Sequence, residues 1–242
     1  MDQEQMERER LIRTEMLLGE AAMERLRQAH VAVFGIGGVG GYAVEALARS
    51  GIGALTLIDH DVISASNLNR QIIATQEEIG SYKVDVMRRR IASIAPSCQV
   101  QTHCCFFLPE TAGQFDFSEY DYVIDAVDTV SAKIEIILRA KQAGRPVISC
   151  MGTGNKLDPA QLEVADLEQT SVCPLARVMR RELRARHVTG VKVVYSKEMP
   201  RKPMPLEGQM GNKPVPASAV FVPGAAGLML AAQVVRELTG QL

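Results

Sequence analysis

A cluster of glycines between a predicted strand and a predicted helix is the first feature that could do chemistry. The cluster contains the spacing G-x-G-x-x-G and includes Gly35, Gly37, Gly38 and Gly40. The backbone N–H groups of such a loop, with the amino end of the following helix, bind phosphate oxygens. Asp59 ends the next predicted strand, where a carboxylate can accept hydrogen bonds from a ribose. These residues predict a nucleotide site, and the alternative is a glycine turn that only allows close packing.

Amide and cationic side chains follow the strand that ends at Asp59. Asn67, Arg70 and Gln71 lie in the run SNLNRQ, and Lys83 follows in GSYK. Cations near phosphates stabilise the charge that develops when pyrophosphate leaves a triphosphate, whereas a nicotinamide ring needs flat, uncharged space. Asp128, in the run DAVDT after a later strand, is placed to bind Mg²⁺. The chain has no G-x-x-x-x-G-K-[ST] motif, which excludes a P-loop enzyme.

A basic segment predicts contact with nucleic acid. Between residues 177 and 202 there are nine basic side chains and two acidic ones, although the net charge of the chain is −1. Spacings of three and four residues place four arginines on one face of a predicted helix. Such a stripe suits a phosphate backbone, and the alternative is a solvated helix face. The residues expected to contact RNA are Arg177, Arg180, Arg181, Arg184, Lys192, Lys197, Arg201 and Lys202.

The composition favours a soluble, cytoplasmic protein. Hydrophobic residues make up 47% and charged residues 23% of the chain, which excludes disordered and fibrous classes. The five cysteines include no C-x-x-C pair, so we expect no zinc, and their odd number fits reduced thiols. The charged amino-terminal segment is unlike a signal peptide. The uncharged run 217–235 just reaches the length of a membrane span, but its prolines and glycines favour a buried helix.

Strands and helices are predicted to alternate after an amino-terminal helical segment that is interrupted near Gly19. The predicted strands cover residues 30–35, 54–61, 98–104, 120–128, 145–152, 161–167 and 191–196. Helices are expected at 42–50, 82–94, 131–144 and 174–186. This alternation predicts an α/β fold: a doubly wound, mostly parallel, Rossmann-like sheet with helices on both faces and appended carboxyl-terminal strands and helix. We expect one domain over 1–242, with a nucleotide-binding core at about 30–155, a basic RNA-facing part at about 156–216 and a buried helix at about 222–239.

The motifs together closely resemble the ubiquitin-activating-enzyme-like adenylating superfamily. The resemblance rests on GIGGVG, IDHDVISASNLNRQ, GSYK and DAVDT, covers about residues 10–155 and continues to the last helix. It implies adenylation of a carboxylate with ATP and Mg²⁺, and a homodimer. The runs RTEMLLG, MGTGNKLDP and TSVCPLARVMRREL further resemble its tRNA-modifying dehydratases. That likeness implies ATP-dependent cyclisation of threonylcarbamoyladenosine in tRNA through an acyl-adenylate.

The resemblance also implies roles for individual residues. The ATP-binding residues would be Gly35, Gly37, Gly38, Gly40, Asp59, Asn67, Arg70, Gln71, Lys83 and Asp128. Gln71 would support Arg70, and Asp128 would bind Mg²⁺ beside the α-phosphate. Arg13 matches an arginine that dimers of this superfamily insert into the partner's site. The implied catalytic residues are Arg13, Arg70, Lys83 and Asp128.

Three other functions remain open at this point. A related enzyme would adenylate the terminal glycine of a ubiquitin-like sulfur-carrier protein, although such relatives usually have two C-x-x-C zinc pairs. An NAD-dependent oxidoreductase would need a placed His or Tyr–Lys pair, and none is evident in the sequence. A non-catalytic scaffold would bind ATP and hand RNA or sulfur to other enzymes. Cys173 lies where ubiquitin-activating relatives have a thioester cysteine, so it is either a structural thiol or a sulfur-handling one.

Overall fold

The computed structural model describes residues 3–204 and 216–241 and contains a seven-stranded sheet of order β3-β2-β1-β4-β5-β7-β6. Neighbouring strands are parallel except β6 and β7, which are antiparallel. The strands are β1 (His30–Phe34), β2 (Ala54–Ile58), β3 (Gln99–His103), β4 (Tyr122–Asp125), β5 (Val147–Cys150), β6 (Leu162–Asp166) and β7 (Lys192–Ser196). The chain therefore winds outward from β1 in both directions, which confirms the predicted doubly wound, mostly parallel sheet.

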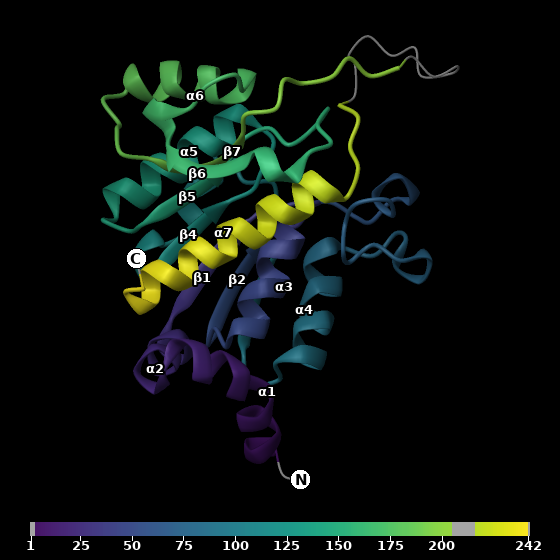
Figure 1. Cartoon of the computed structure of the whole chain (residues 1–242), viewed down its shortest axis with the longest axis vertical. Helices are drawn as coiled ribbons and strands as arrows, with labels where there is room; N and C mark the ends of the chain where they lie inside the picture. Colours follow the sequence, from purple (N-terminus) through teal and green to yellow (C-terminus); the bar gives the residue numbers. More distant parts are fainter. Residues whose placement is uncertain (1–2, 205–215, 242) are drawn as a thin grey trace.

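Helices cover both faces of the sheet, as Figure 1 shows. One face carries α2, α3, α4 and α7, and the other carries α5 and α6. The helices are α1 (Gln3–Leu18), α2 (Glu20–Gln28), α3 (Gly40–Ser50), α4 (Lys83–Ile94), α5 (Val130–Gln142), α6 (Pro174–Arg184) and α7 (Phe221–Thr239). Short 3-10 helices include η1 (Ala65–Asn67) and η6 (Leu167–Gln169). The break between α1 and α2 falls at Gly19, as predicted.

Strand β1 illustrates why the predicted strands are almost continuously apolar. Val31 and Val33 belong to the core beneath α3 and α7, whereas Ala32 and Phe34 belong to the core beneath α5. Side chains alternate between the two faces of a strand, and here both faces are covered. All four of these residues are fully buried, so β1 lies between the two hydrophobic cores.

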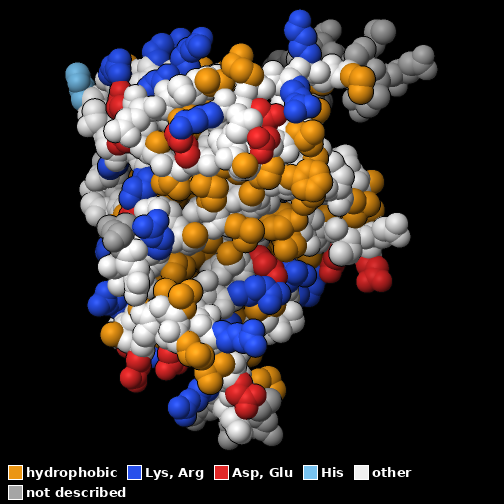
Figure 2. Space-filling model, viewed as in Figure 1, with side chains coloured by type: hydrophobic (Ala, Val, Ile, Leu, Met, Phe, Trp, Pro, Cys, Tyr) orange, Lys and Arg blue, Asp and Glu red, His pale blue; other side chains and the backbone are white. Residues whose placement is uncertain are grey.

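Helix α7 is the segment that the sequence analysis tested as a membrane span. It is long and apolar enough to cross a membrane, but half of its most apolar window is buried within the protein. A Cβ on Gly227 would lie 2.3 Å from the carbonyl oxygen of Val39, so α7 and the start of α3 are in close contact. The predicted buried helix is therefore a core element, and it begins at Phe221. Figure 2 shows an apolar band over its outer face, to which Phe221 and Leu228 contribute.

Two local expectations need correction. The strand predicted over 98–104 is one residue too long at each end, because β3 covers Gln99–His103, and Cys104 and Cys105 both lie in the loop that follows. Helix α6 ends at Arg184, two residues before the predicted end. The segment 205–215, within the basic part predicted at about 156–216, lies outside the described residues.

Candidate nucleotide-binding site

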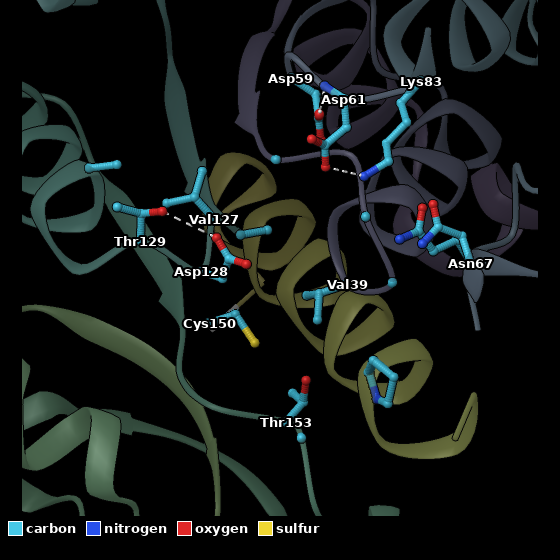
Figure 3. A pocket seen from close by; sticks show the side chains of 18 of the residues that line it. Val39, Asp59, Asp61, Asn67, Lys83, Val127, Asp128, Thr129, Cys150 and Thr153 are labelled. Atoms are coloured by element: carbon cyan, nitrogen blue, oxygen red, sulfur yellow. Dashed lines mark hydrogen bonds and ion pairs between the residues drawn. The ribbon is translucent and has the colours of Figure 1, made fainter. Parts of the chain in front are cut away.

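A cavity of about 620 Å³ opens at the carboxyl ends of β1, β2, β4 and β5. Its walls come from the glycine loop, the segment 58–71, the loop 126–129, the loop 150–154 and the start of α7. The cavity lies where the winding of the sheet reverses, which is the usual ligand position in doubly wound folds. Figure 3 shows several of its side chains at close range.

The glycine loop forms one wall, and its members have different roles. Gly35, Gly37 and Gly38 line the cavity, whereas Gly40 does not. Gly35 has a φ of 88°, and a Cβ there would lie 2.7 Å from the carbonyl oxygen of Ala126. A Cβ on Gly40 would lie only 1.8 Å from the carbonyl oxygen of Gly35. Three glycines therefore expose backbone to a ligand, and Gly40 allows α3 to begin directly against the loop.

Asp59 connects β2 to the glycine loop. Its Oδ2 accepts the backbone N–H of Ile36 at 2.6 Å, and its Oδ1 accepts that of Asp61 at 2.8 Å. The side chain is buried at the cavity wall. Two charge-assisted hydrogen bonds fix this carboxylate before any ligand binds, with acceptor sites still available on both oxygens.

The run SNLNRQ, which follows β2 and contains the end of η1, brings Arg70 and Gln71 next to the glycine loop: a Cβ on Gly38 would lie 3.6 Å from Cγ of Arg70, and one on Gly37 would lie 3.8 Å from Nε2 of Gln71. Asn67 accepts the backbone N–H of Ser64 at 3.1 Å, which closes the turn. Arg70 donates to the backbone oxygen of Ser66 at 2.6 Å. The Oε1 atom of Gln71 is buried without a hydrogen-bond partner, and no hydrogen bond joins Gln71 to Arg70 within residues 3–204 and 216–241. The support of Arg70 by Gln71 stays a prediction.

Lys83 reaches the cavity from the first turn of α4. Its side chain is buried, and its Nζ atom lies 2.6 Å from Oδ2 of Asp61. The same aspartate lies 3.1 Å from Nε2 of His60. Asp61 thus fixes a cation in the cavity that the glycine loop also lines; binding of phosphate by Lys83 stays a prediction.

Asp128 lies on the loop between β4 and α5, and its exposed side chain lines the cavity. Thr129 donates its hydroxyl to Oδ1 of Asp128 at 3.3 Å (Figure 3). A carboxylate that is exposed beside a phosphate-binding loop has the chemistry that Mg²⁺ prefers. The group Asp59, His60 and Asp61 also brings its ligand atoms within 4.8 Å of one another. The carboxylates of that group are already bonded to backbone N–H groups or to Lys83, so Asp128 fits the metal better.

Two buried cysteines lie near the same cavity. Cys150 ends β5 and lines the cavity, and burial raises the pKa of its thiol to about 12. Cys173 caps α6 and is 3% exposed. A thioester needs an accessible thiol, and the side chains of Cys150 and Cys173 are both buried. The burial of Cys173 therefore favours the structural role among the alternatives considered.

Arg13 is exposed on α1, away from the cavity of its own chain. Its neighbour Leu11 packs near Gly51, at the end of α3. The cavity lies at the beginning of that helix, near Gly38. Arg13 is thus remote from the cavity of this chain, and the predicted insertion into a partner's site stays a prediction.

The basic segment is more divided than its sequence suggests. The spacing predicts Arg180 in the outer stripe, but it turns inward and donates to the backbone oxygens of Leu167, the first residue of η6, and of Thr170, which follows η6. Lys192 lies on β7 and pairs with Glu237 of α7. Of the side chains expected to contact RNA, those that remain exposed are Arg177, Arg181, Arg184, Lys197, Arg201 and Lys202.

Most of the exposed cations also have acidic neighbours. Arg184 lies 2.5 Å from Glu168, and Lys197 pairs with Glu163. Both of these acids precede the segment 177–202, so they were outside the charge count. Figure 2 nevertheless shows Lys and Arg side chains gathered over α6 at the top of the molecule.

Lys133 is a residue that the sequence analysis missed. It is fully buried in α5, and its Nζ lies 2.9 Å from Oδ2 of Asp125 beneath the Asp128 loop. A signal existed, because Lys133 shares the helix face of Ile137 and Ala140. A lysine at an apolar position of a helix indicates a buried partner.

Comparison with known proteins gives this site a context. The family model described as the ThiF family matches residues 9–241. The chain is 41% identical over 238 residues to the tRNA threonylcarbamoyladenosine dehydratase of Bacillus subtilis, covering 93% of each chain. It is 40% identical over 199 residues to the Escherichia coli protein of the same name, covering 79% of this chain and 74% of that one.

Solved structures are similar throughout the fold. The crystal structure of E. coli tRNA N6-threonylcarbamoyladenosine dehydratase in complex with ATP has a TM-score of 0.88 and 35% sequence identity, and the match covers 97% of this chain and 95% of that one. The same protein in complex with AMP has the same TM-score and coverage. From its fold, its site and these matches, the chain belongs to the ThiF family.

Proposed function

We propose that this protein catalyses the ATP-dependent dehydration of threonylcarbamoyladenosine in tRNA, with ring closure through an acyl-adenylate. The observation that carries the proposal is the cavity itself. It combines a glycine loop, the cations Arg70 and Lys83 and the carboxylate of Asp128. The similarity to an enzyme of that activity, solved with ATP, supports this assignment.

The proposed reaction has two steps. The threonyl carboxylate of the modified adenosine attacks the α-phosphorus of ATP, and the bond to pyrophosphate breaks. A nucleophilic atom of the same modification then attacks the activated carbonyl, which closes a ring and expels AMP. The net loss from the nucleoside is one water. Intramolecular attack reaches effective molarities of roughly 10⁵ M or more, so the protein mainly has to orient the second step.

Charge stabilisation is the main task of this chain in the first step. Arg70 and Lys83 face the cavity from one wall, where they would bind the triphosphate. Backbone N–H groups between Gly35 and Gly38, which lie next to Arg70, would bind it as well. Fixed cations and dipoles that are oriented before reaction lower the barrier without reorganisation. Asp128 would hold Mg²⁺, which when bound neutralises phosphate charge.

The tRNA would approach over α6. Two exposed arginines, Arg177 and Arg181, lie on α6, and the exposed Lys202 lies near residue 204, where the described segment ends. They would supply affinity through the phosphate backbone, independently of base sequence. The pairing of other cations with Glu163 and Glu168 limits the number of contacts.

We also propose a homodimer in which Arg13 enters the partner's cavity. Two apolar surfaces support association: Met16 and Leu17 on α1 are 82% and 80% exposed, and Phe221 and Leu228 continue the exposed apolar face of α7. Large exposed apolar patches mark protein interfaces. Mixing Arg13→Ala with Asp128→Ala subunits tests this arrangement. Recovered activity is expected, since some mixed dimers have one intact site, and no recovery in proven mixed dimers contradicts it.

The function is tested by incubating tRNA that contains threonylcarbamoyladenosine with the protein, ATP and Mg²⁺. Nuclease digestion and mass spectrometry should show a nucleoside lighter by one water, and Asp128→Ala should abolish the change. An unchanged nucleoside mass, with ATP binding intact, would contradict the proposal. It would direct attention to the carrier-protein alternative, which small proteins ending in Gly-Gly would test through pyrophosphate exchange.

A further inference from the structure

Three polar side chains are buried beneath the loop that carries Asp128. Asp125, Lys133 and Ser149 each have no exposed side-chain surface. Nζ of Lys133 lies 2.9 Å from Oδ2 of Asp125, and Ser149 donates its hydroxyl to the same oxygen at 2.5 Å. They come from β4, α5 and β5, so the cluster joins three elements under one wall of the cavity.

The cluster holds the two peptide groups that immediately precede Asp128. Oδ1 of Asp125 accepts the backbone N–H of Val127 at 3.2 Å. Nζ of Lys133 donates to the backbone oxygen of Val127 at 3.0 Å. The first bond fixes the peptide plane before Val127, and the second fixes the plane that joins Val127 to Asp128. The hydrogen bonds from Asp125 and Lys133 therefore fix the backbone from which the Asp128 side chain projects.

Stability alone is a weak reason for such a cluster. Taking a lysine and an aspartate out of water is costly, and replacing a buried ion pair with apolar residues is often neutral or stabilising. Lys133 also occupies a position that apolar residues fill elsewhere on the inner face of α5. The ion pair supplies an acceptor for the backbone N–H of Val127 and a donor for its carbonyl oxygen, which an apolar pair cannot do.

We propose that Lys133 and Asp125 are positioning residues that orient the carboxylate of Asp128 toward metal-bound ATP. This inference rests on the proposed adenylation, in which Asp128 contacts Mg²⁺. Neither residue lines the cavity, so neither is expected to touch the substrate. Outer residues that orient a metal ligand typically change metal affinity or activity by about 10-fold to 100-fold when mutated.

The test uses the charge-free double variant Asp125→Asn/Lys133→Met, which avoids leaving one buried charge unpaired. Two quantities are measured on the full chain: the affinity for an ATP analogue without metal, by calorimetry, and the affinity for Mn²⁺ in the presence of that analogue, by electron paramagnetic resonance. We expect analogue binding to be retained and Mn²⁺ affinity to fall by about 10-fold to 100-fold. Pyrophosphate exchange should fall by a similar factor.

Two further variants guard against an effect on folding. Ser149→Ala removes one hydrogen bond to Asp125 and should weaken Mn²⁺ binding less than the double variant does. Glu45→Gln/Arg90→Met removes another ion pair, between the buried carboxylate of Glu45 and the partly exposed Arg90, whose Oε2–Nε distance is 2.6 Å and which lies away from the cavity. It should leave Mn²⁺ affinity unchanged, whatever it does to thermal stability.

The outcomes separate this inference from the proposed function. Unchanged Mn²⁺ affinity in a folded double variant overturns the positioning role, and so does equal weakening in the Glu45/Arg90 control. If the double variant does not fold, unchanged Mn²⁺ affinity in Ser149→Ala overturns it. A wild-type protein that leaves the tRNA nucleoside unchanged contradicts the proposed function, while the Mn²⁺ comparison still decides whether Lys133 and Asp125 orient Asp128.

Discussion

Lys83 and Asp61 form an ion pair of 2.6 Å at the wall of the cavity, and the lysine is buried while the aspartate is half exposed. An ammonium group has three donors, and this contact uses one of them. The remaining donors are available to a phosphate, and the lysine is already fixed when a nucleotide arrives. Asp61 thus holds the cation in place from the solvent side.

Replacing this lysine should impair the first chemical step. We expect Lys83→Met to lower the rate of ATP–pyrophosphate exchange by roughly 10²–10³-fold, because a fixed cation next to the leaving group is lost. Exchange assays with saturating substrate measure the effect. Lys141→Met is the control, since Lys141 is exposed and donates to the backbone oxygen of Gly190 outside the cavity. Similar rates in both variants would refute the role of Lys83.

Gly40 should be intolerant of even one methyl group. A Cβ there would overlap the carbonyl oxygen of Gly35, 1.8 Å away, so the start of α3 must shift. We expect Gly40→Ala to destabilise the protein by about 1–3 kcal/mol or more and to weaken ATP binding. Thermal unfolding and calorimetry measure the two effects. Gly113→Ala, whose Cβ would have nothing within 4 Å, should change neither.

Arg177 and Arg180 should respond differently to mutation although they are one helical turn apart. Arg177 is exposed, so Arg177→Glu should weaken tRNA binding. It should also reduce the slope of log K for tRNA binding against log salt concentration by about 1. Arg180 donates to the backbone oxygens of Leu167 and Thr170, so Arg180→Ala should lower thermal stability and leave that slope unchanged. Fluorescence anisotropy of labelled tRNA at several salt concentrations measures the slope for each variant. Equal slopes in both variants would contradict the assignment.

His30 should make the protein less stable in mild acid. Burial lowers the pKa of this imidazole more than the nearby Glu119 and Asp121 raise it, and its Nε2 lies 2.8 Å from the hydroxyl of Thr56. The unfolded chain therefore takes up the proton first, below about pH 6.5. The free energy of unfolding should fall as pH drops from there, and it is fully retained above.

Urea unfolding at a series of pH values measures this effect. His30→Gln should show a smaller decrease just below pH 6.5, while losses at lower pH persist through carboxylates such as Glu45, whose pKa its arginine partners lower despite burial. The same pH profile in the wild type and in His30→Gln would exclude His30 as the cause.

Much of the site could be predicted because the carboxyl ends of parallel strands meet at one edge. Gly35 and Asp128 follow β1 and β4, and Asp59 follows β2, so the sheet brings them together across long stretches of sequence. Asn67 and Lys83 come from the segment after β2, which returns to that edge. Strand type was predictable for a related reason, since burial on both faces leaves apolar runs.

Side-chain direction and distant partners were not predictable from local spacing. Arg180 has the spacing of an outer stripe, yet it turns inward to donate to the backbone oxygens of Leu167 and Thr170. Glu168 and Glu237 lie outside the segment 177–202, so a count within it overestimates the free positive charge. The ion pair between Lys133 and Asp125 also depends on contact between a helix and a strand that only the folded chain makes.

The first turn of α7 packs against the glycine loop: a Cβ on Gly38 would lie 3.5 Å from Cβ of Pro223. Both residues line the cavity. A nucleotide that contacts this wall binds only while α7 is docked, so binding favours the docked state by mass action. Amide hydrogens of α7 should then exchange with solvent more slowly as ATP is added. Hydrogen exchange in α7, the last helix, therefore reports whether a nucleotide occupies the glycine loop near the start of the sequence.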